Sequence, residues 1–188
     1  NFSLDTFKAD KFRYITRRGN LDDVIRAVEK ALKIGIAPVK INTVIMKGFN
    51  DNEILDFVKL AYETPLNVRF IEFMPIGDLP FYKKERLVSM DEIKQTIETR
   101  YELLKSSMMR GNGPAKSYQI KGGMGSIGFI SAMSEHFCGA CNRLRLTADG
   151  RLRGCLFGKE EVNLKPALAR QAGVEELAAL FRQAVLAK

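Results

Sequence analysis

The first 75 residues carry apolar side chains in two alternating spacings, and each spacing predicts one kind of element. Between residues 21 and 32, apolar positions recur every three or four residues, as they do on one face of a helix. Asn20 can cap this helix and Gly35 can end it. Residues 39–46 instead form a run rich in β-branched side chains, which predicts a buried strand.

The same alternation then repeats. Asn50 or Asp51 can cap a second helix, whose apolar residues fall on one side between positions 54 and 61, and residues 67–74 read as another strand. Residues 2–4 look like the end of an earlier strand. Strand, helix, strand, helix and strand at this spacing imply right-handed crossovers and a parallel sheet, so we expect an α/β fold.

The pattern changes after residue 76. Ser89 and Glu92 can form a capping box, which predicts a helix that runs through Leu104. Short alternating stretches and a final helical pattern follow. They predict antiparallel strands over 117–121, 127–131, 142–147 and 151–156, and a helix over 174–187. We therefore expect two parts: the βα units of residues 1–76, and an α+β extension over residues 77–188.

Composition narrows the class of protein. The chain has 188 residues, 46% of them hydrophobic, which is enough for a sizeable core. Its net charge is +8, but the basic residues are scattered and not interleaved with aromatic ones, which argues against nucleic acid. Apolar runs are too short for a membrane span, and no signal peptide is visible. The chain opens with NFSLD instead of Met, and we expect it to be a piece of a longer protein.

Three cysteines carry the most specific chemistry: Cys138, Cys141 and Cys155, with the spacing C-x2-C-x13-C. An odd number, clustered late, argues against a disulfide framework and favours a metal site in a reducing cytoplasm. An iron–sulfur cubane has four irons to ligate, so three thiolates would leave one iron open to another ligand. Zinc is the alternative, with His136 as the fourth ligand of a Cys3His site. The spacing alone leaves both metals open.

The cysteines flank a hairpin whose turn decides which side chains share a face. A three-residue loop of Ala148, Asp149 and Gly150 pairs residue 147 with residue 151, with Gly150 in the left-handed conformation. This register places Leu146 opposite Leu152 and Arg143 opposite Cys155. One face then holds four leucines, and the other holds two cysteines and a band of arginines. A two-residue loop would mix the faces, and we predict the three-residue loop.

Arginine suits phosphate because its planar fork donates two hydrogen bonds at once. We interpret Arg143 and Arg145, close to Cys141, as phosphate ligands, and Arg151 and Arg153 as residues of a solvated face.

Gly123, Gly125 and Gly128 match the spacing G-x-G-x-x-G of dinucleotide-binding loops. That motif needs a helix after it, whereas a strand-like FISAM follows here. We therefore predict a hairpin turn and no nucleotide contact at these glycines.

With these residues in place, the chain resembles the GTP 3′,8-cyclase family of radical S-adenosylmethionine enzymes, also called molybdenum cofactor biosynthesis protein A. The resemblance covers nearly the whole chain and rests on the segments NFSLDT, VKINTVIMKGFNDNEI, VRFIEFMPIG and IGFISAMSEHFCGACNRLRLTADGRLRGCLF. It implies the C-terminal part of a partial (β/α) radical SAM barrel, followed by an extension that closes the barrel mouth.

The resemblance also assigns site residues. It implies that Cys138, Cys141 and Cys155 hold the second of two [4Fe–4S] clusters, whose open iron binds the guanine of GTP. Arg143, Arg145 and Lys40 match residues that contact GTP. Ser3 and Met74 match positions that line the S-adenosylmethionine site, and Arg69 is a further candidate there. No residue is assigned as a catalytic acid or base.

The implied reaction converts GTP to 3′,8-cyclo-7,8-dihydro-GTP, with GTP and S-adenosylmethionine as partners and no nucleic acid or membrane. The family's first cluster uses a C-x3-C-x2-C motif that this sequence does not contain, and the family ends in a Gly-Gly tail, whereas this chain ends LFRQAVLAK. The 188 residues alone are therefore expected to be inactive. The alternative is a zinc- or cluster-stabilised module of another radical SAM enzyme with auxiliary clusters. The oligomeric state is open, with a homodimer among the states considered.

Overall fold

The computed structural model describes residues 1–76, 82–105, 115–135, 141 and 143–187. The chain forms two compact units. The first comprises Asn1–Pro75 and Leu79–Gly139, and the second comprises Ile76–Asp78 and Ala140–Lys188. This division differs from the expected boundary after residue 76, because strands beyond residue 100 join the sheet of the first unit.

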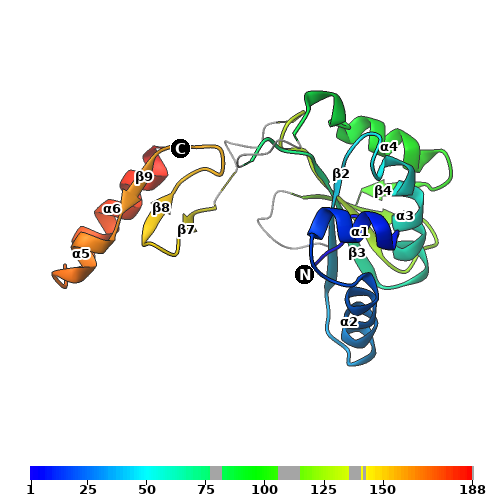
Figure 1. Ribbon diagram of the computed structural model, residues 1–188, viewed down its shortest axis with the longest axis horizontal. Coiled ribbons are helices and arrows are strands. Elements are labelled where there is room, and N and C mark those ends of the chain that lie inside the picture. The colour runs from blue at the N-terminus through cyan, green and yellow to red at the C-terminus, as the bar shows by residue number, and fades with distance from the viewer. Residues whose placement is uncertain (77–81, 106–114, 136–140, 142, 188) are drawn as a thin grey trace. The chain divides into compact units, whose positions relative to one another are not determined.

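The first unit is built on a six-stranded sheet (Figure 1). Its strands, in order across the sheet, are β1 (Phe2–Ser3), β2 (Val39–Ile45), β3 (Leu66–Glu72), β6 (Ser126–Ile130), β5 (Lys116–Ile120) and β4 (Leu103–Lys105). The first four are parallel, which confirms the prediction for residues 1–76. The expectation that all strands after residue 117 would be antiparallel is wrong for β6, which is parallel to β3 and antiparallel to β5.

The described residues of this unit form four α-helices. They are α1 (Ala9–Thr16), α2 (Leu21–Lys33), α3 (Ile54–Glu63) and α4 (Met90–Glu98), with 3-10 turns η1 (Asp51–Glu53) and η2 (Lys84–Arg86). The Asn20 cap and the Ser89–Glu92 capping box are both formed. Helix α4 ends at Glu98 instead of Leu104, because Leu103–Lys105 pairs with β5 as a strand.

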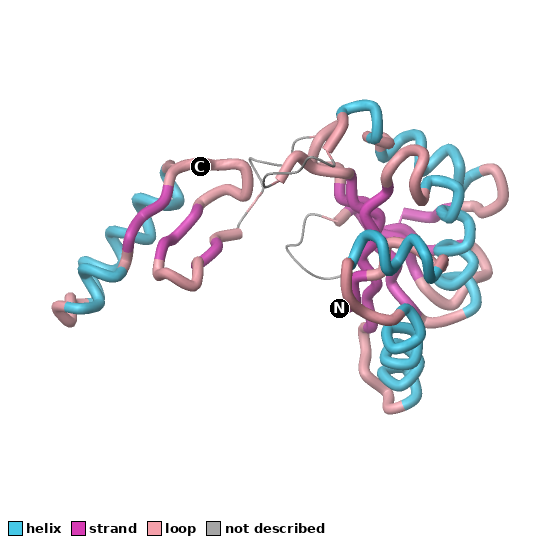
Figure 2. Tube along the Cα trace, in the orientation of Figure 1, coloured by secondary structure: helices cyan, strands magenta, loops and turns pink. Residues whose placement is uncertain are grey.

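The helices cover one face of the sheet (Figure 2). The strand residues on that face are apolar and almost fully buried. They include Val39, Ile41, Ile45, Val68, Phe70, Ile127 and Phe129. The alternate residues of the same strands face the other way and are largely polar. A parallel sheet normally has both faces covered and apolar, so a polar second face is a departure with functional meaning.

The described residues of the second unit form a small antiparallel sheet and two helices. Its elements are β7 (Arg145–Leu146), β8 (Arg151–Arg153), β9 (Glu161–Asn163), α5 (Lys165–Ala169) and α6 (Val174–Leu186). Helix α6 packs over β8 and β9, and its bounds agree with the predicted final helix. Buried Leu152, Leu164 and Ala184 form the centre of a small core.

The hairpin has the predicted three-residue loop. Thr147 N–H donates to the Arg151 carbonyl at 2.9 Å, and Gly150 adopts a φ of +78°. Leu146 pairs with Leu152, as expected. The strands are shorter than predicted, and the two paired leucines differ in burial: Leu146, on edge strand β7, is 64% exposed, while Leu152 is 2% exposed.

Gly123 and Gly125 lie in the turn between β5 and β6, as predicted, whereas Gly128 lies within β6, where it pairs with Arg69 and Ser117. Met124 and Gly125 donate their N–H groups to the Tyr62 and Ala61 carbonyls at the end of α3, at 2.9 and 2.8 Å. These two amides are therefore occupied by a helix end and do not form a phosphate cradle.

No helix among the described residues is long and apolar enough to cross a membrane.

Candidate functional site: the polar sheet face and the cysteine hairpin

The polar face of the first unit carries a row of aligned residues. Ser3 pairs with Asn42, Asn42 with Arg69, and Arg69 with Gly128, so one level of the sheet runs across four parallel strands. Paired residues in adjacent strands point to the same face. Lys40 lies on this face two residues before Asn42, which is about 7 Å along the strand. The sheet therefore brings two predicted ligand residues, Ser3 and Lys40, and the further candidate Arg69 onto one surface.

Arg69 is held in place on this face by neighbours. Its Nε donates to Asn67 Oδ1 at 2.8 Å, and Asn67 Nδ2 donates to Ser126 Oγ at 3.0 Å. Gly128 leaves room for the arginine, because a Cβ there would lie 3.1 Å from Arg69 Cγ. These two hydrogen bonds fix the orientation of the Arg69 guanidinium group. In the described part of the chain, its terminal nitrogens make no ion pair with a carboxylate.

The partial burial of the Arg69 charge favours the binding of an anion. Burial lowers the pKa of the Arg69 guanidinium, because desolvation disfavours the charged form. Arginine nevertheless stays protonated in proteins. A half-buried cation without an ion-pair partner among the described residues is costly alone and is stabilised by a negatively charged ligand.

Asn67 and Ser126 were missed by sequence reasoning. Asn67 is 3% exposed and Ser126 is 8% exposed. The available signal was a polar residue at alternate positions of otherwise apolar strands, as in LNVRFIE. That pattern did not predict that β3 and β6 are neighbours, and so it did not place Asn67 beside Ser126.

Met74 lies two residues beyond the end of β3 and is half-buried. Its position after the carboxyl end of a parallel strand is where sites of βα barrels are found. Ser3, the last residue of β1, also lies at such an end and is exposed.

Asp5 lies two residues after β1, and burial raises the pKa of its carboxyl group, although a hydrogen bond from Val44 N–H at 2.7 Å favours the charged form. Because the folded state binds this proton more tightly than the unfolded state, the stabilising contribution is present at low pH and is lost as the pH rises through the folded-state pKa. Asp5→Asn keeps an acceptor for Val44 and cannot ionise. We expect it to raise the melting temperature more at pH 7 than at pH 4, as measured by circular dichroism.

An equal shift of the Asp5→Asn melting temperature at pH 4 and pH 7 would contradict this assignment. The variant would then act through packing and not through the carboxylate charge.

The second unit carries the cysteine hairpin. Cys141 and Cys155 are both half-buried, and Cys155 lies two residues after β8. The loop after it folds back, since a Cβ at Gly158 would lie 3.3 Å from Cys155 Cβ. His136 and Cys138 lie outside the described residues. Among the residues that are described, no group of three or more His, Cys, Asp or Glu side chains is placed to hold a metal ion.

The donor chemistry of this hairpin fits a thiolate-bound metal centre. The thiols of Cys141 and Cys155 are soft ligands of the kind that iron–sulfur clusters and zinc use. Both cysteines are partly accessible. With the thiol of Cys138 they make the three-ligand set predicted from sequence.

Charge on the hairpin is unevenly compensated. Arg145, Arg153 and Glu161 form one row across the three strands. Arg153 makes an ion pair with Glu161, and Arg151 Nε donates to Asp149 Oδ2 at 2.9 Å. No carboxylate in the described part of the chain pairs with Arg145, although it sits directly opposite Arg153. Like charges opposite each other destabilise a sheet, so Arg145 is positioned at a cost that an anionic ligand would offset.

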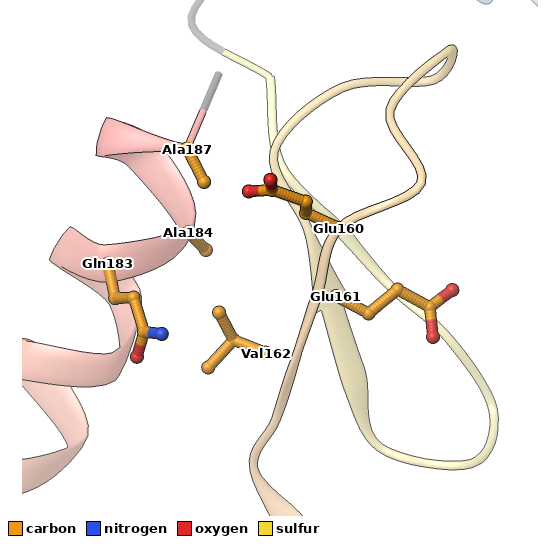
Figure 3. A pocket seen from close by; sticks show the side chains of 6 residues that line it. All are labelled: Glu160, Glu161, Val162, Gln183, Ala184 and Ala187. Carbon is orange, nitrogen blue, oxygen red and sulfur yellow. The ribbon is translucent and has the colours of Figure 1, made fainter.

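Glu161 also borders a pocket of about 270 Å³ between β9 and α6, lined by Glu160, Glu161, Val162, Gln183, Ala184 and Ala187. Figure 3 shows the Glu161 carboxylate directed away from the helix, on the side opposite Gln183. The Glu161 carboxylate makes its ion pair with Arg153. None of the predicted ligand residues that the structure describes lines this pocket.

Comparison with known proteins adds to these observations. A family model described as Molybdenum Cofactor Synthesis C matches residues 66–188, and one described as the Radical SAM superfamily matches residues 1–61. The chain is 57% identical over all 188 residues to a GTP 3′,8-cyclase of Syntrophomonas wolfei and 51% identical over 188 residues to one of Moorella thermoacetica. It is 46% identical over 186 residues to one of Desulforamulus reducens.

The chain spans 58% of the length of the first two relatives and 57% of the third. Its architecture is that of a partial radical SAM barrel followed by an extension, with the parallel strands β1 to β3 and the antiparallel sheet β7 to β9. Since the matched family model covers more than half of the sequence, the chain belongs to the Molybdenum Cofactor Synthesis C family.

Proposed function

We propose that this chain is part of a GTP 3′,8-cyclase, a cytoplasmic radical S-adenosylmethionine enzyme that converts GTP to 3′,8-cyclo-7,8-dihydro-GTP in molybdenum cofactor biosynthesis. The observation that carries the proposal is the match of the whole chain, at 57% identity, to a relative of that name. Two features of the structure support it: a polar sheet face with an oriented cation, and a cysteine hairpin with an uncompensated one.

S-adenosylmethionine, when bound, would supply the radical chemistry that joins C3′ of the GTP ribose to C8 of guanine. Most of the work left to the protein is placement, because a well-oriented reactant pair gains the advantage of a very high effective concentration. Holding the nucleotide at both its base and its triphosphate fixes the ribose between them.

This chain's residues would share the placement as follows. Arg143, Arg145 and Lys40 neutralise and orient the triphosphate, with the arginines acting through bidentate hydrogen bonds. Ser3 and Met74 line the S-adenosylmethionine site, where the oriented guanidinium of Arg69 offers a bond to a carboxylate or phosphate.

Cys138, Cys141 and Cys155 would hold a [4Fe–4S] cluster, which supplies an iron with an open coordination position for the guanine. Four protein ligands would close that position, so a set of three suits a cluster that binds substrate. The other cluster, the source of electrons for cleaving S-adenosylmethionine, belongs to the C-x3-C-x2-C motif expected outside this sequence.

Metal content tests the proposal directly. All three cysteines of the chain belong to the proposed set, so thiolate-bound metal reports on this site alone. After anaerobic reconstitution with iron and sulfide, we expect a brown protein with about four irons per chain. We expect Cys155→Ser to lose more than half of that iron, and Ser131→Ala, which removes a hydroxyl without touching a proposed ligand, to retain it.

A colourless protein that holds one zinc per chain would contradict the proposal and favour the zinc-stabilised module. A brown protein that binds GTP no better than ATP would instead favour another radical SAM enzyme with auxiliary clusters.

A further inference from the structure

Glu72, the last residue of β3, is a buried carboxylate that the proposed chemistry does not use. It is 0% exposed, and no cation in the described part of the chain pairs with it. A buried charge of this kind persists only where hydrogen bonds satisfy it. The donors that satisfy it therefore show what the residue does.

Four donors converge on this carboxylate. Oε2 accepts from Met133 N–H at 2.6 Å and from Ser134 N–H at 2.9 Å. Oε1 accepts from Met90 N–H at 3.2 Å and from the Ser134 hydroxyl. Met90 is the first residue of α4, where N–H groups lack helical partners and a negative charge is favourable. Glu72 thus ties the end of a parallel strand to a helix start and to the segment after β6.

The segment it grips leads straight into the proposed cluster ligands. Cys138 is four residues beyond Ser134, and four residues span at most about 14 Å. Fixing the Ser134 backbone therefore restricts where the first cysteine of C-x2-C can lie. The Glu135 carboxylate in this segment also accepts from the Ser131 hydroxyl at 2.9 Å and pairs with Lys116. The Glu135 and Lys116 side chains are 54% and 61% exposed, and such exposed pairs contribute little.

We propose that Glu72 is a positioning residue for the three-cysteine cluster: its carboxylate anchors Met133 and Ser134 and thereby sets the entry of the chain into the ligand segment. This inference rests on the proposed function, since it requires that the cysteines hold a cluster. It goes beyond that function by assigning a role to a residue that touches neither metal nor substrate.

Glu53 provides a control. It is 1% exposed, and its carboxylate likewise accepts hydrogen bonds from a backbone N–H and a hydroxyl, those of Phe7 and Thr6, at 2.8 to 2.9 Å. Unlike Glu72, it also pairs with a cation, Lys11 Nζ, at 3.0 Å. Its partners lie within or just before α1, far from the cysteines in the sequence. Glu53→Gln should therefore report the cost of neutralising a buried, hydrogen-bonded carboxylate without any effect directed at the cluster.

The test compares Glu72→Gln, Ser134→Ala and Glu53→Gln after anaerobic reconstitution. Glu72→Gln has nearly the same shape and leaves no cavity. Its amide NH2 group would face two of the donors from which the carboxylate accepts, so the hydrogen bonds that hold Met133 and Ser134 are weakened. We expect both Glu variants to lower the melting temperature. We expect Glu72→Gln to speed iron release to a chelator by at least fivefold, Ser134→Ala to speed it less, and Glu53→Gln to leave the rate unchanged. We expect Glu72→Gln, and to a lesser degree Ser134→Ala, also to broaden the electron paramagnetic resonance spectrum of the reduced cluster.

Each outcome decides the question. Equal iron-release rates and identical spectra in Glu72→Gln and Glu53→Gln would overturn the role of Glu72 and leave the proposed function standing. A wild-type chain that takes up no cluster would overturn both. If Glu72→Gln does not fold, Ser134→Ala alone must show faster iron release than Glu53→Gln, and equal rates overturn the inference.

Discussion

Replacing Arg145 with alanine should weaken GTP binding by about 10- to 150-fold. A hydrogen bond to a charged group contributes about 1.5–3 kcal/mol, and each 1.4 kcal/mol is a factor of ten in affinity. Arg145 is half-buried, faces Arg153 across the hairpin, and has no carboxylate partner in the described part of the chain. Its charge is therefore available to the triphosphate. Isothermal titration with GTP on the anaerobically reconstituted chain measures the effect.

Arg151 is the control for this variant, because it carries the same charge on the same hairpin. It is already hydrogen-bonded to Asp149 and exposed, so Arg151→Ala should change GTP affinity less than threefold. Equal losses in the two variants would mean that the hairpin acts through overall charge alone. An unchanged affinity in Arg145→Ala would remove this residue from the site.

Replacing Gly125 with alanine should destabilise the first unit by more than about 3 kcal/mol, beyond the usual cost of over-packing. A Cβ at this position would lie 2.2 Å from the Leu66 carbonyl oxygen and 2.5 Å from that of Ala61. Both obstacles are backbone atoms and cannot swing aside as a side chain can. Urea unfolding followed by circular dichroism should show the transition moved to much lower denaturant, or no folded baseline.

Gly173 is the control for this variant, because a methyl group added there would contact no other atom. A Cβ added to it would have no neighbouring atom within 4 Å, and the residue precedes α6 with a φ of −66°. Gly173→Ala should cost about 1 kcal/mol or less, the effect of a poorer helix cap. If Gly125→Ala were as mild as Gly173→Ala, the close approach of the turn to the end of α3 would not govern that glycine.

The elements that sequence predicted well are those with a strong local signal. Helix α2 has a cap at Asn20 and a stop at Gly35, and the hairpin loop has Gly150 where a positive φ is required. The parallel order of β1, β2 and β3 followed from the strand–helix alternation. In each case, residues close in the sequence decide the outcome.

The elements that sequence missed depend on distant partners. Helices α1 and α5 are short and each bury one residue, Phe12 and Ala167, so their apolar periodicity is weak. Strand β4 continues from a helical pattern and is a strand only because β5 lies beside it. The parallel pairing of β6 with β3 joins residues about 60 positions apart, which no local pattern encodes.

The same division holds for the candidate site. Cysteine spacing, the arginines beside it and the resemblance of whole segments suggested the ligand residues. The supporting contacts were not visible in that way. Asn67 orients Arg69 through a bond to Ser126 on another strand, and Glu72 holds Ser134 from 62 positions away. Such contacts exist only once the sheet is assembled.

The two-faced parallel sheet has a consequence for how such a protein can change. Along β3, Val68 and Phe70 serve the interior under the helices, while their neighbours Asn67 and Arg69 serve the opposite surface. Even-numbered positions of this strand are therefore constrained by packing of the core, and odd-numbered positions by the ligand that the polar face would bind. A lineage can rewrite its ligand preference at every second residue of a strand and leave the interior that folds the chain unaltered.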